Sequence, residues 1–247
     1  MDLATQPVTK KNRDAYYWRL VATAASFALF GLGGLCLRVL VFPVLGCLPG
    51  DALKHRHRAR QTVSRLFWFF VRFMARTGVL TYDIQGAERL GRPGQMIIAN
   101  RPSLIAVLFL FRLRSTEYIS NDGSMDMLDA AAESLQNGQT LIIFPEGTRT
   151  QPGQAPAFHR GAASIALRGA KILTPVVIKV NPTTLTKAEP WYRIPSRRVH
   201  FSFRVGADID PQTFAAQGPA PQASRKLNDY LHSYFIKELA EDERSTP

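Results

Sequence analysis

The feature that most constrains this chain is an apolar run near its N-terminus. Residues 20–37 are eighteen consecutive residues without a charge, and the apolar pattern resumes after Arg38 and continues to residue 48. A helix of eighteen residues extends about 27 Å, close to the roughly 30 Å hydrocarbon core of a bilayer. Residues 20–48 are therefore predicted to be a hydrophobic membrane segment.

Basic residues flank this segment on both sides, and cytoplasmic flanks are the ones enriched in Lys and Arg. They are Lys10, Lys11, Arg13 and Arg19 before it and Lys54, Arg56, Arg58 and Arg60 after it. Glycines at 31–34 and Pro43 can interrupt a helix. The sequence therefore favours a re-entrant helical hairpin at the cytoplasmic face of the inner or plasma membrane, with one crossing as the alternative.

A cleaved signal and a buried core helix are the alternatives to a membrane segment. Residues 44–47 weakly resemble a lipoprotein cleavage site, but Leu45 is large and no Gly/Ser-rich tether follows. A buried core helix is disfavoured by Tyr16, Tyr17 and Trp18, which have the position of an interfacial aromatic belt. Both alternatives are weaker than the membrane segment, and both stay open.

Positive charge is concentrated in the same part of the chain. The 247 residues carry a net charge of +12, and residues 1–76 hold twelve basic and three acidic side chains, hence nine of those charges. A positive excess indicates an anionic partner. Because the remainder is nearly balanced, anionic lipid fits better than nucleic acid. Residues 54–76 are predicted to form a basic amphipathic helix, which suits a membrane surface or packing against a domain.

Short apolar runs alternate with helical patterns after residue 77. Strands are predicted at 81–85, 95–99, 118–119, 140–144, 174–180 and 199–205, and helices at 103–112, 125–136, 161–168 and 224–239. This alternation predicts an α/β domain over 77–215, with a mixed, mostly parallel sheet flanked by helices. A basic tail at 1–19 precedes the membrane segment, and a C-terminal amphipathic helix is expected at 222–240. Cys36 and Cys47 indicate neither a disulfide framework nor a metal site.

The most informative motif is FPEGTR at 144–149, directly after a predicted buried strand. Its Pro and Gly favour a turn that an anion can approach closely, and Arg149 supplies a forked cationic donor. An ordinary turn with a solvated Arg would explain any one of these residues, but six contiguous ones favour an anion-binding loop.

Four segments together resemble the phospholipid/glycerol acyltransferase family, which includes 1-acylglycerol-3-phosphate acyltransferases. They are residues 97–106, 144–149, 158–162 and 174–176. The resemblance covers about residues 60–210 and implies a single acyltransferase-type domain in phospholipid biosynthesis. The implied reaction moves an acyl chain from acyl-CoA or acyl carrier protein to the free hydroxyl of a lysophospholipid such as lysophosphatidate. The implied partners are membrane lipids, that acceptor and the acyl donor, with no metal or organic cofactor and no nucleic acid.

The resemblance also assigns residues to the substrate phosphate. These are Glu146, Gly147, Thr148 and Arg149, with His159 and Arg160 as further candidate substrate-binding residues. In this assignment Arg149 binds the phosphate, Glu146 holds the loop through backbone donors, and Gly147 permits close approach.

The family's catalytic positions are altered in this chain. In the family, a His accepts the proton of the acceptor hydroxyl as its oxygen attacks the thioester, and an Asp five positions later orients the ring. Arg101 and Ala106 occupy these positions. A guanidinium has no acceptor for a proton and an alanine orients nothing. We therefore expect no intact catalytic residue, and an inactive or greatly impaired copy.

Two more departures accompany this one. Arg101 and Glu146 are forty-five positions apart, which is short of the family's usual separation by about one strand-and-helix unit, with the junction near 112–117. Asp122 stands where many members have an Arg. No other His is a convincing base: His159 is close to the third motif, His55 and His57 belong to the cationic membrane face, and His200 and His232 have no carboxylate pattern nearby.

Besides an impaired enzyme, three hypotheses stay open. The chain can be a working acyltransferase with an unrecognised base, a non-catalytic membrane protein that binds lipid or acyl carrier, or a degenerate copy whose shortened segment prevents a stable sheet.

Overall fold

The structure, a computed structural model, describes residues 13–110, 116–119, 125–147, 157–184 and 192–245. The helices are α1 (Arg13–Cys36), a π-helical turn (Leu37–Val41), α2 (Phe42–Cys47), α3 (Ala52–Arg76), a 3-10 turn (Ala87–Arg89), α4 (Leu104–Leu110), α5 (Met125–Gln136), α6 (Gly161–Gly169), α7 (Gln212–Ala215) and α8 (Ala220–Ser245). The strands are β1 (Leu80–Gln85), β2 (Gln95–Ala99), β3 (Thr116–Ile119), β4 (Thr140–Ile143), β5 (Ile172–Asn181) and β6 (Val199–Val205).

The strands form one six-stranded sheet in the order β1-β6-β5-β2-β4-β3. Every neighbouring pair is parallel except β5 and β6, which are antiparallel. The predicted mixed, mostly parallel sheet is therefore confirmed. Because β2, β4 and β5 run in one direction, their C-terminal ends meet at one edge of the sheet.

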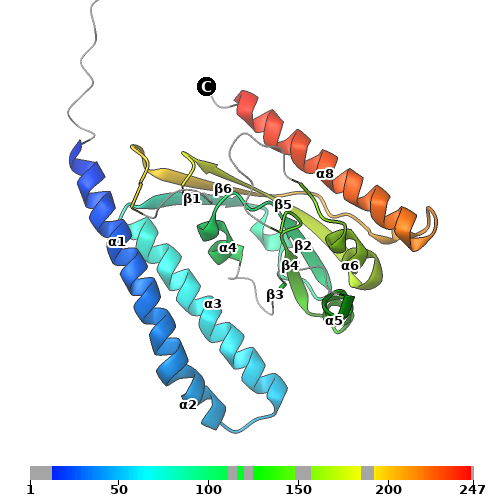
Figure 1. Cartoon of the computed structure of the whole chain (residues 1–247), viewed down its shortest axis with the longest axis horizontal. Coiled ribbons are helices and arrows are strands. Elements are labelled where there is room, and N and C mark those ends of the chain that lie inside the picture. The colour runs from blue at the N-terminus through cyan, green and yellow to red at the C-terminus, as the bar shows by residue number, and fades with distance from the viewer. Residues whose placement is uncertain (1–12, 111–115, 120–124, 148–156, 185–191, 246–247) are drawn as a thin grey trace, which may run out of the picture.

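Helices cover both faces of the sheet (Figure 1), and each face has its own apolar core. Ile97 packs with residues of α3 and α4, whereas its neighbours Met96 and Ile98 pack with residues of α5, α6 and α8. Alternate side chains of a strand point to opposite faces, so a strand that is apolar throughout is buried on both. The result is three layers with β2 in the middle of the sheet.

The N-terminal helices form an antiparallel hairpin beside the sheet (Figure 1). Phe30 of α1 lies 5.1 Å from Phe70 of α3 between ring centroids. The Trp18 indole Nε1–H donates to the Thr77 carbonyl at 2.8 Å. The chain reverses between α2 and α3, where the Asp51 carboxylate caps α3 by accepting from the Lys54 backbone N–H at 2.9 Å.

The predicted break at residues 31–34 is wrong, because α1 continues through these glycines to Cys36. A glycine weakens a helix by about 1 kcal/mol but does not end it. Packing against α3 stabilises α1 in this region. The π-helical turn at Leu37–Val41 precedes Pro43, which lies in the first turn of α2. A proline has no N–H to donate to the preceding turn, and the wider π-helical turn lies directly before it. The helical segment is thus continuous up to the reversal that follows Cys47.

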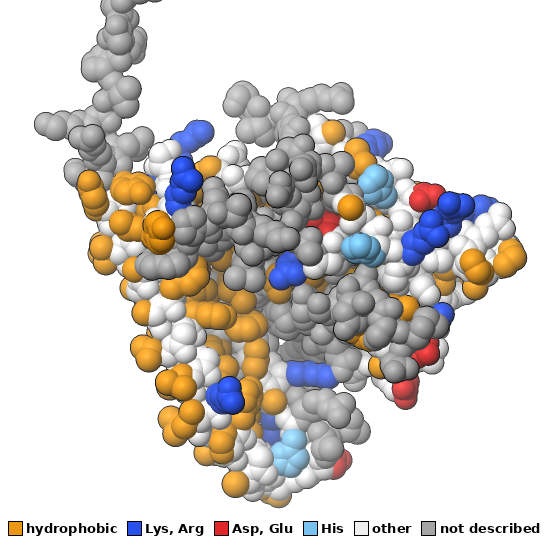
Figure 2. Space-filling model, viewed as in Figure 1, with side chains coloured by type: hydrophobic (Ala, Val, Ile, Leu, Met, Phe, Trp, Pro, Cys, Tyr) orange, Lys and Arg blue, Asp and Glu red, His pale blue; other side chains and the backbone are white. Residues whose placement is uncertain are grey.

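One helical segment in the described ranges, Tyr16–Cys47, is long and apolar enough to cross a membrane, and its most apolar stretch is not buried in the protein. Figure 2 shows apolar side chains gathered along the side formed by α1 and α2. Leu32 and Leu40 are 61% and 60% exposed. Burial in the core of this chain therefore does not account for the apolar sequence, although a signal sequence has the same character.

The predicted elements agree with the structure in type, with shifts at their ends. Residues 95–99, 125–136 and 199–205 match β2, α5 and β6. The last helix is longer than expected and covers Ala220–Ser245. Ser124, the predicted cap of α5, and residues 112–115 of the predicted junction lie outside the described residues.

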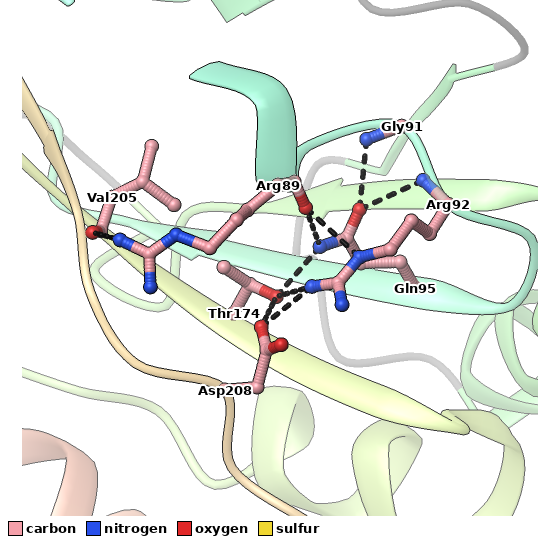
Figure 3. Close-up of polar contacts among 7 residues, drawn as sticks. All are labelled: Arg89, Gly91, Arg92, Gln95, Thr174, Val205 and Asp208. Atoms are coloured by element: carbon pink, nitrogen blue, oxygen red, sulfur yellow. Dashed lines mark hydrogen bonds and ion pairs between the residues drawn. The ribbon is translucent and has the colours of Figure 1, made fainter. Parts of the chain in front are cut away.

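A polar network ties the sheet together at the start of β2 (Figure 3). The buried Gln95 amide donates to Thr174 Oγ1 at 2.6 Å, and Thr174 Oγ1 donates to Asp208 Oδ1 at 2.8 Å. Arg92 Nη2 donates to the same carboxylate oxygen at 2.6 Å. This network lies at the end of β2 away from Asn100 and Arg101.

Candidate functional site

The loop after β4 is held against the loop after β2. Glu146 is 5% exposed, and its Oε1 accepts a hydrogen bond from the Arg101 backbone N–H at 3.1 Å. A buried carboxylate that accepts a hydrogen bond from a backbone N–H holds the loop that carries this N–H in place. The two motifs, forty-five positions apart, are thereby joined into one site at the C-terminal edge of the sheet.

The turn that carries Glu146 is tight. The Gly147 N–H donates to the Phe144 carbonyl at 3.2 Å, and Gly147 has a φ of 65°. This left-handed conformation is strained for residues with a Cβ. The His159 N–H donates to the Pro145 carbonyl at 2.9 Å, so the segment before α6 also joins the loop. The side chains of His159 and Arg160 are exposed.

Arg101 is half-buried at the end of β2. Its guanidinium carbon lies 5.8 Å from the centroid of the Phe144 ring, within the range of a cation–π contact. Its Nε is buried without a hydrogen-bond partner, and so is the Ser103 hydroxyl two residues on. The Asn100 side chain exchanges two hydrogen bonds with the Ile178 backbone, at 2.8 and 2.7 Å, and so fastens the same turn to β5.

Ala106 has a different environment. It lies in α4 with no exposed surface, inside the apolar core between the sheet, α3 and α4. Nothing polar is therefore available at the position where the resemblance expects a carboxylate.

These loops belong to a region that matches known proteins. The sequence model of the Acyltransferase family matches residues 61–179, which include the loop of Arg101 and the loop of Glu146.

Residues 61–179 of this chain are therefore acyltransferase-like.

Two curated relatives support this assignment. A 1-acyl-sn-glycerol-3-phosphate acyltransferase of Pseudomonas aeruginosa is 28% identical over 109 residues, which are 44% of this chain and 38% of the relative. The chloroplastic 1-acyl-sn-glycerol-3-phosphate acyltransferase LPAT1 of Arabidopsis thaliana is 32% identical over 63 residues, which are 24% of this chain and 18% of the relative. The matched parts thus span less than two-fifths of either relative.

A solved structure shares the fold of this chain. The 1-acyl-sn-glycerophosphate acyltransferase PlsC of Thermotoga maritima superposes with a TM-score of 0.62, covering 90% of this chain and 98% of PlsC. The sequence identity is 17%. The superposition therefore confirms the α/β fold and carries no argument about the reaction.

The structure brings together only some of the residues that the sequence proposes for the acyltransferase site. Arg101, Glu146 and Gly147 lie in adjoining loops, and His159 is linked to them through its backbone. Thr148, Arg149 and Asp122 lie outside the described residues. The roles assigned to all these residues stay predictions.

Sequence reasoning missed Ser103 and gave no role to Asn100. Both belong to the segment 97–106, but a sequence does not show that a hydroxyl is buried without a partner. The prediction that His200 has no carboxylate nearby is wrong. Its Nε2 lies 2.8 Å from Asp83 Oδ1 and its Nδ1 lies 2.8 Å from Thr81 Oγ1, because β1 pairs with β6. This cluster is exposed on the β1–β6 side of the sheet, two strands away from β2.

The remaining histidines have no place in this site. The ring nitrogens of His55 lie 3.0 Å from the Leu45 and Gly50 carbonyls, at the turn between α2 and α3. The His232 ring packs against Phe158 at 5.7 Å between centroids. The side chain of His57 lies outside the described part of the chain.

Proposed function

We propose that this protein is a membrane-associated glycerolipid acyltransferase homologue that binds a lysophosphatidate-like acceptor and transfers acyl chains to it at a greatly reduced rate. The observation that carries the proposal is the position of Arg101. Its backbone N–H is bound to the buried Glu146 carboxylate, so the turn of the family's catalytic base is in place while the base is not.

Retention of binding is supported by the geometry of the loop after β4. Glu146 is buried, and Gly147 adopts the left-handed conformation that lets a ligand approach the backbone. Thr148 and Arg149 follow directly in sequence. By resemblance Arg149 would bind the acceptor phosphate, and His159 and Arg160 would contribute to the same pocket.

The reduced rate of acyl transfer follows from the chemistry of the two substituted positions. A guanidinium stays protonated and offers no lone pair to the acceptor hydroxyl. Ala106 is enclosed in an apolar core and provides no group to orient a base. Loss of a general base typically lowers a rate by about a hundredfold to ten-thousandfold.

The membrane part of the proposal rests on the N-terminal hairpin. The exposed apolar surface of α1 and α2 suits a bilayer, and α3 carries basic side chains that suit anionic headgroups at a cytoplasmic face. The acyl donor would be acyl-CoA or acyl carrier protein. A second candidate, a wholly non-catalytic lipid- or acyl-carrier-binding protein, is favoured by the buried, unpartnered Nε of Arg101.

Measured acyl transfer tests the proposal. The full chain in detergent micelles is assayed with lysophosphatidate and acyl-CoA, beside the Thermotoga maritima acyltransferase as a positive control. We expect turnover at least about a hundredfold below the control. Turnover comparable to the control, and lost in Arg149→Ala, would contradict the proposal.

The double variant Arg101→His with Ala106→Asp separates the causes of a low rate. A gain of activity would show that only the two catalytic side chains are missing. No gain in a folded double variant would attribute the low rate to the shortened segment between Arg101 and Glu146.

A further inference from the structure

Two buried polar atoms near the start of α4 have no hydrogen-bond partner. They are Arg101 Nε and Ser103 Oγ, and no other buried side-chain nitrogen or oxygen in the described ranges lacks one. Native proteins pair about nine in ten such groups, and leaving one unpaired costs about 1–3 kcal/mol. Two such atoms on one three-residue turn indicate a site made for an acceptor that the chain itself does not supply.

The chemistry of these atoms restricts the acceptor. An Arg Nε–H only donates, and a Ser hydroxyl can donate to the same group. A guanidinium and a hydroxyl both suit an oxyanion, above all a phosphate, whose several oxygens can each accept.

The surroundings hold these donors in place. The Phe144 ring lies against the guanidinium, with 5.8 Å between the guanidinium carbon and the ring centroid. Glu146 binds the Arg101 backbone N–H at 3.1 Å, and Asn100 is bound twice to Ile178. The backbone of the turn is therefore held in place before binding, which reduces the entropy lost when a ligand binds.

We propose that Arg101 Nε and Ser103 Oγ form an oxyanion subsite for the phosphate monoester of a lysophosphatidate-like lipid. The inference rests on the proposed function, because it names the ligand class of that same site. The substitution that removes the family's base would thus convert its position into a phosphate-binding position. Acceptor and protein then form a stable complex in which acyl transfer is slow.

The structure also predicts how Ser103→Ala changes the stability of the ligand-free chain. Removing a buried hydroxyl without a partner should leave the free energy of unfolding unchanged or raise it. A hydroxyl with a purely structural role would give the opposite sign. Weaker phosphate binding together with unchanged or greater stability is therefore the signature of the subsite.

Binding of two probes tests the subsite. The full chain is titrated with inorganic phosphate, and separately with phosphatidylcholine vesicles that do or do not contain lysophosphatidate. The variants are Arg101→Gln, Arg101→Lys and Ser103→Ala, and Arg225→Gln, an exposed position on α8, is the charge-matched control. We expect Arg101→Gln to weaken binding of both probes about tenfold or more and Ser103→Ala by about threefold. The affinity of Arg101→Lys should fall between those of Arg101→Gln and the wild type, because an ammonium keeps the charge but lacks the fixed fork.

Several results would overturn the subsite. They are a wild-type chain that binds neither probe, equal affinities for Arg101→Gln and Arg225→Gln, and a Ser103→Ala variant that binds normally but is destabilised. Binding of inorganic phosphate without preference for lysophosphatidate vesicles would overturn the lipid assignment. Acyl transfer is a separate measurement, so rapid turnover would contradict the proposed function while these affinities still decide the subsite.

Discussion

Arg101 and Ala106 are five positions apart, yet the fold places them in different surroundings. Arg101 lies at the end of a central strand, half-buried, with its backbone bound to Glu146. Ala106 has no exposed surface and belongs to the apolar core. A substitution at Arg101 therefore changes the chemistry of the candidate site, whereas one at Ala106 also changes the packing of the domain.

Ala106→Asp tests this difference at the scale of one residue. Burial of a carboxylate without a partner should lower the free energy of unfolding by about 2–4 kcal/mol. Urea denaturation measures the effect, and Ala130→Asp, at an exposed position of α5, should change it by about 0.5 kcal/mol or less. Equal stability of both variants would mean that position 106 reaches solvent or a polar partner.

At the scale of elements, the continuous segment from α1 to α2 is the unusual part of the molecule. One side contacts α3 through aromatic rings such as Phe30 and Phe70, while many large apolar side chains are exposed on the rest of its surface. Exposed apolar patches of this extent mark a binding surface. The length and composition of the segment suit a bilayer.

Leu32→Glu with Leu40→Glu tests the membrane role of this segment. Both side chains are highly exposed, at 61% and 60%, so the fold should tolerate the change, while each charge costs about 2.5–3.5 kcal/mol near the centre of a membrane helix. Flotation with liposomes should show a large loss of bound protein. Ile236→Glu, at a 40% exposed apolar position of α8, should float like the wild type. Release of the wild-type chain by a high-salt wash alone would contradict insertion.

At the scale of the whole molecule, polar contacts connect both ends of the central strand β2 to neighbouring segments. The Arg101–Glu146 contact lies at its C-terminal end, and the network of Gln95, Thr174, Arg92 and Asp208 lies at its start (Figure 3). A hydrogen bond from Arg92, together with one from the Thr174 hydroxyl, holds the pKa of Asp208 below its ordinary value, against the opposing effect of burial. Because the pKa is lower in the folded chain, Asp208 stabilises the fold at pH values above its pKa in the unfolded chain, about 3.9. This stabilisation is lost as the pH falls toward the pKa of Asp208 in the folded chain.

Asp208→Asn should therefore lower the free energy of unfolding at pH 7 by about 0.5–1 kcal/mol, a small amount because the ion pair is partly exposed. The difference from the wild type should shrink below about pH 4. Thermal melts across this pH range measure it, with Asp229→Asn at an exposed position of α8 as control. A difference that stays constant with pH would assign the effect to packing and not to charge.

The sequence by itself determined the classes of structure in this protein. A short apolar run predicted β2, a helical pattern predicted α5 and an alternating pattern predicted β6, at their observed bounds, because burial on one or both faces of an element determines which of its residues are apolar. The FPEGTR motif predicted the acyltransferase family, since a contiguous motif is readable without knowledge of the fold. The motif at residues 97–106 placed Arg101 and Ala106 at the positions of the family's catalytic His and Asp.

Only the tertiary structure decided which of these residues meet. The Glu146–Arg101 bond joins residues forty-five positions apart, and the His200–Asp83 contact joins residues 117 positions apart through strand pairing. Continuity of the helix through the glycines at 31–34 depends on packing against α3, which local propensity does not include. That Arg101 Nε and Ser103 Oγ have no partner is likewise a property of the assembled fold, because burial and pairing exist only once distant segments are packed together.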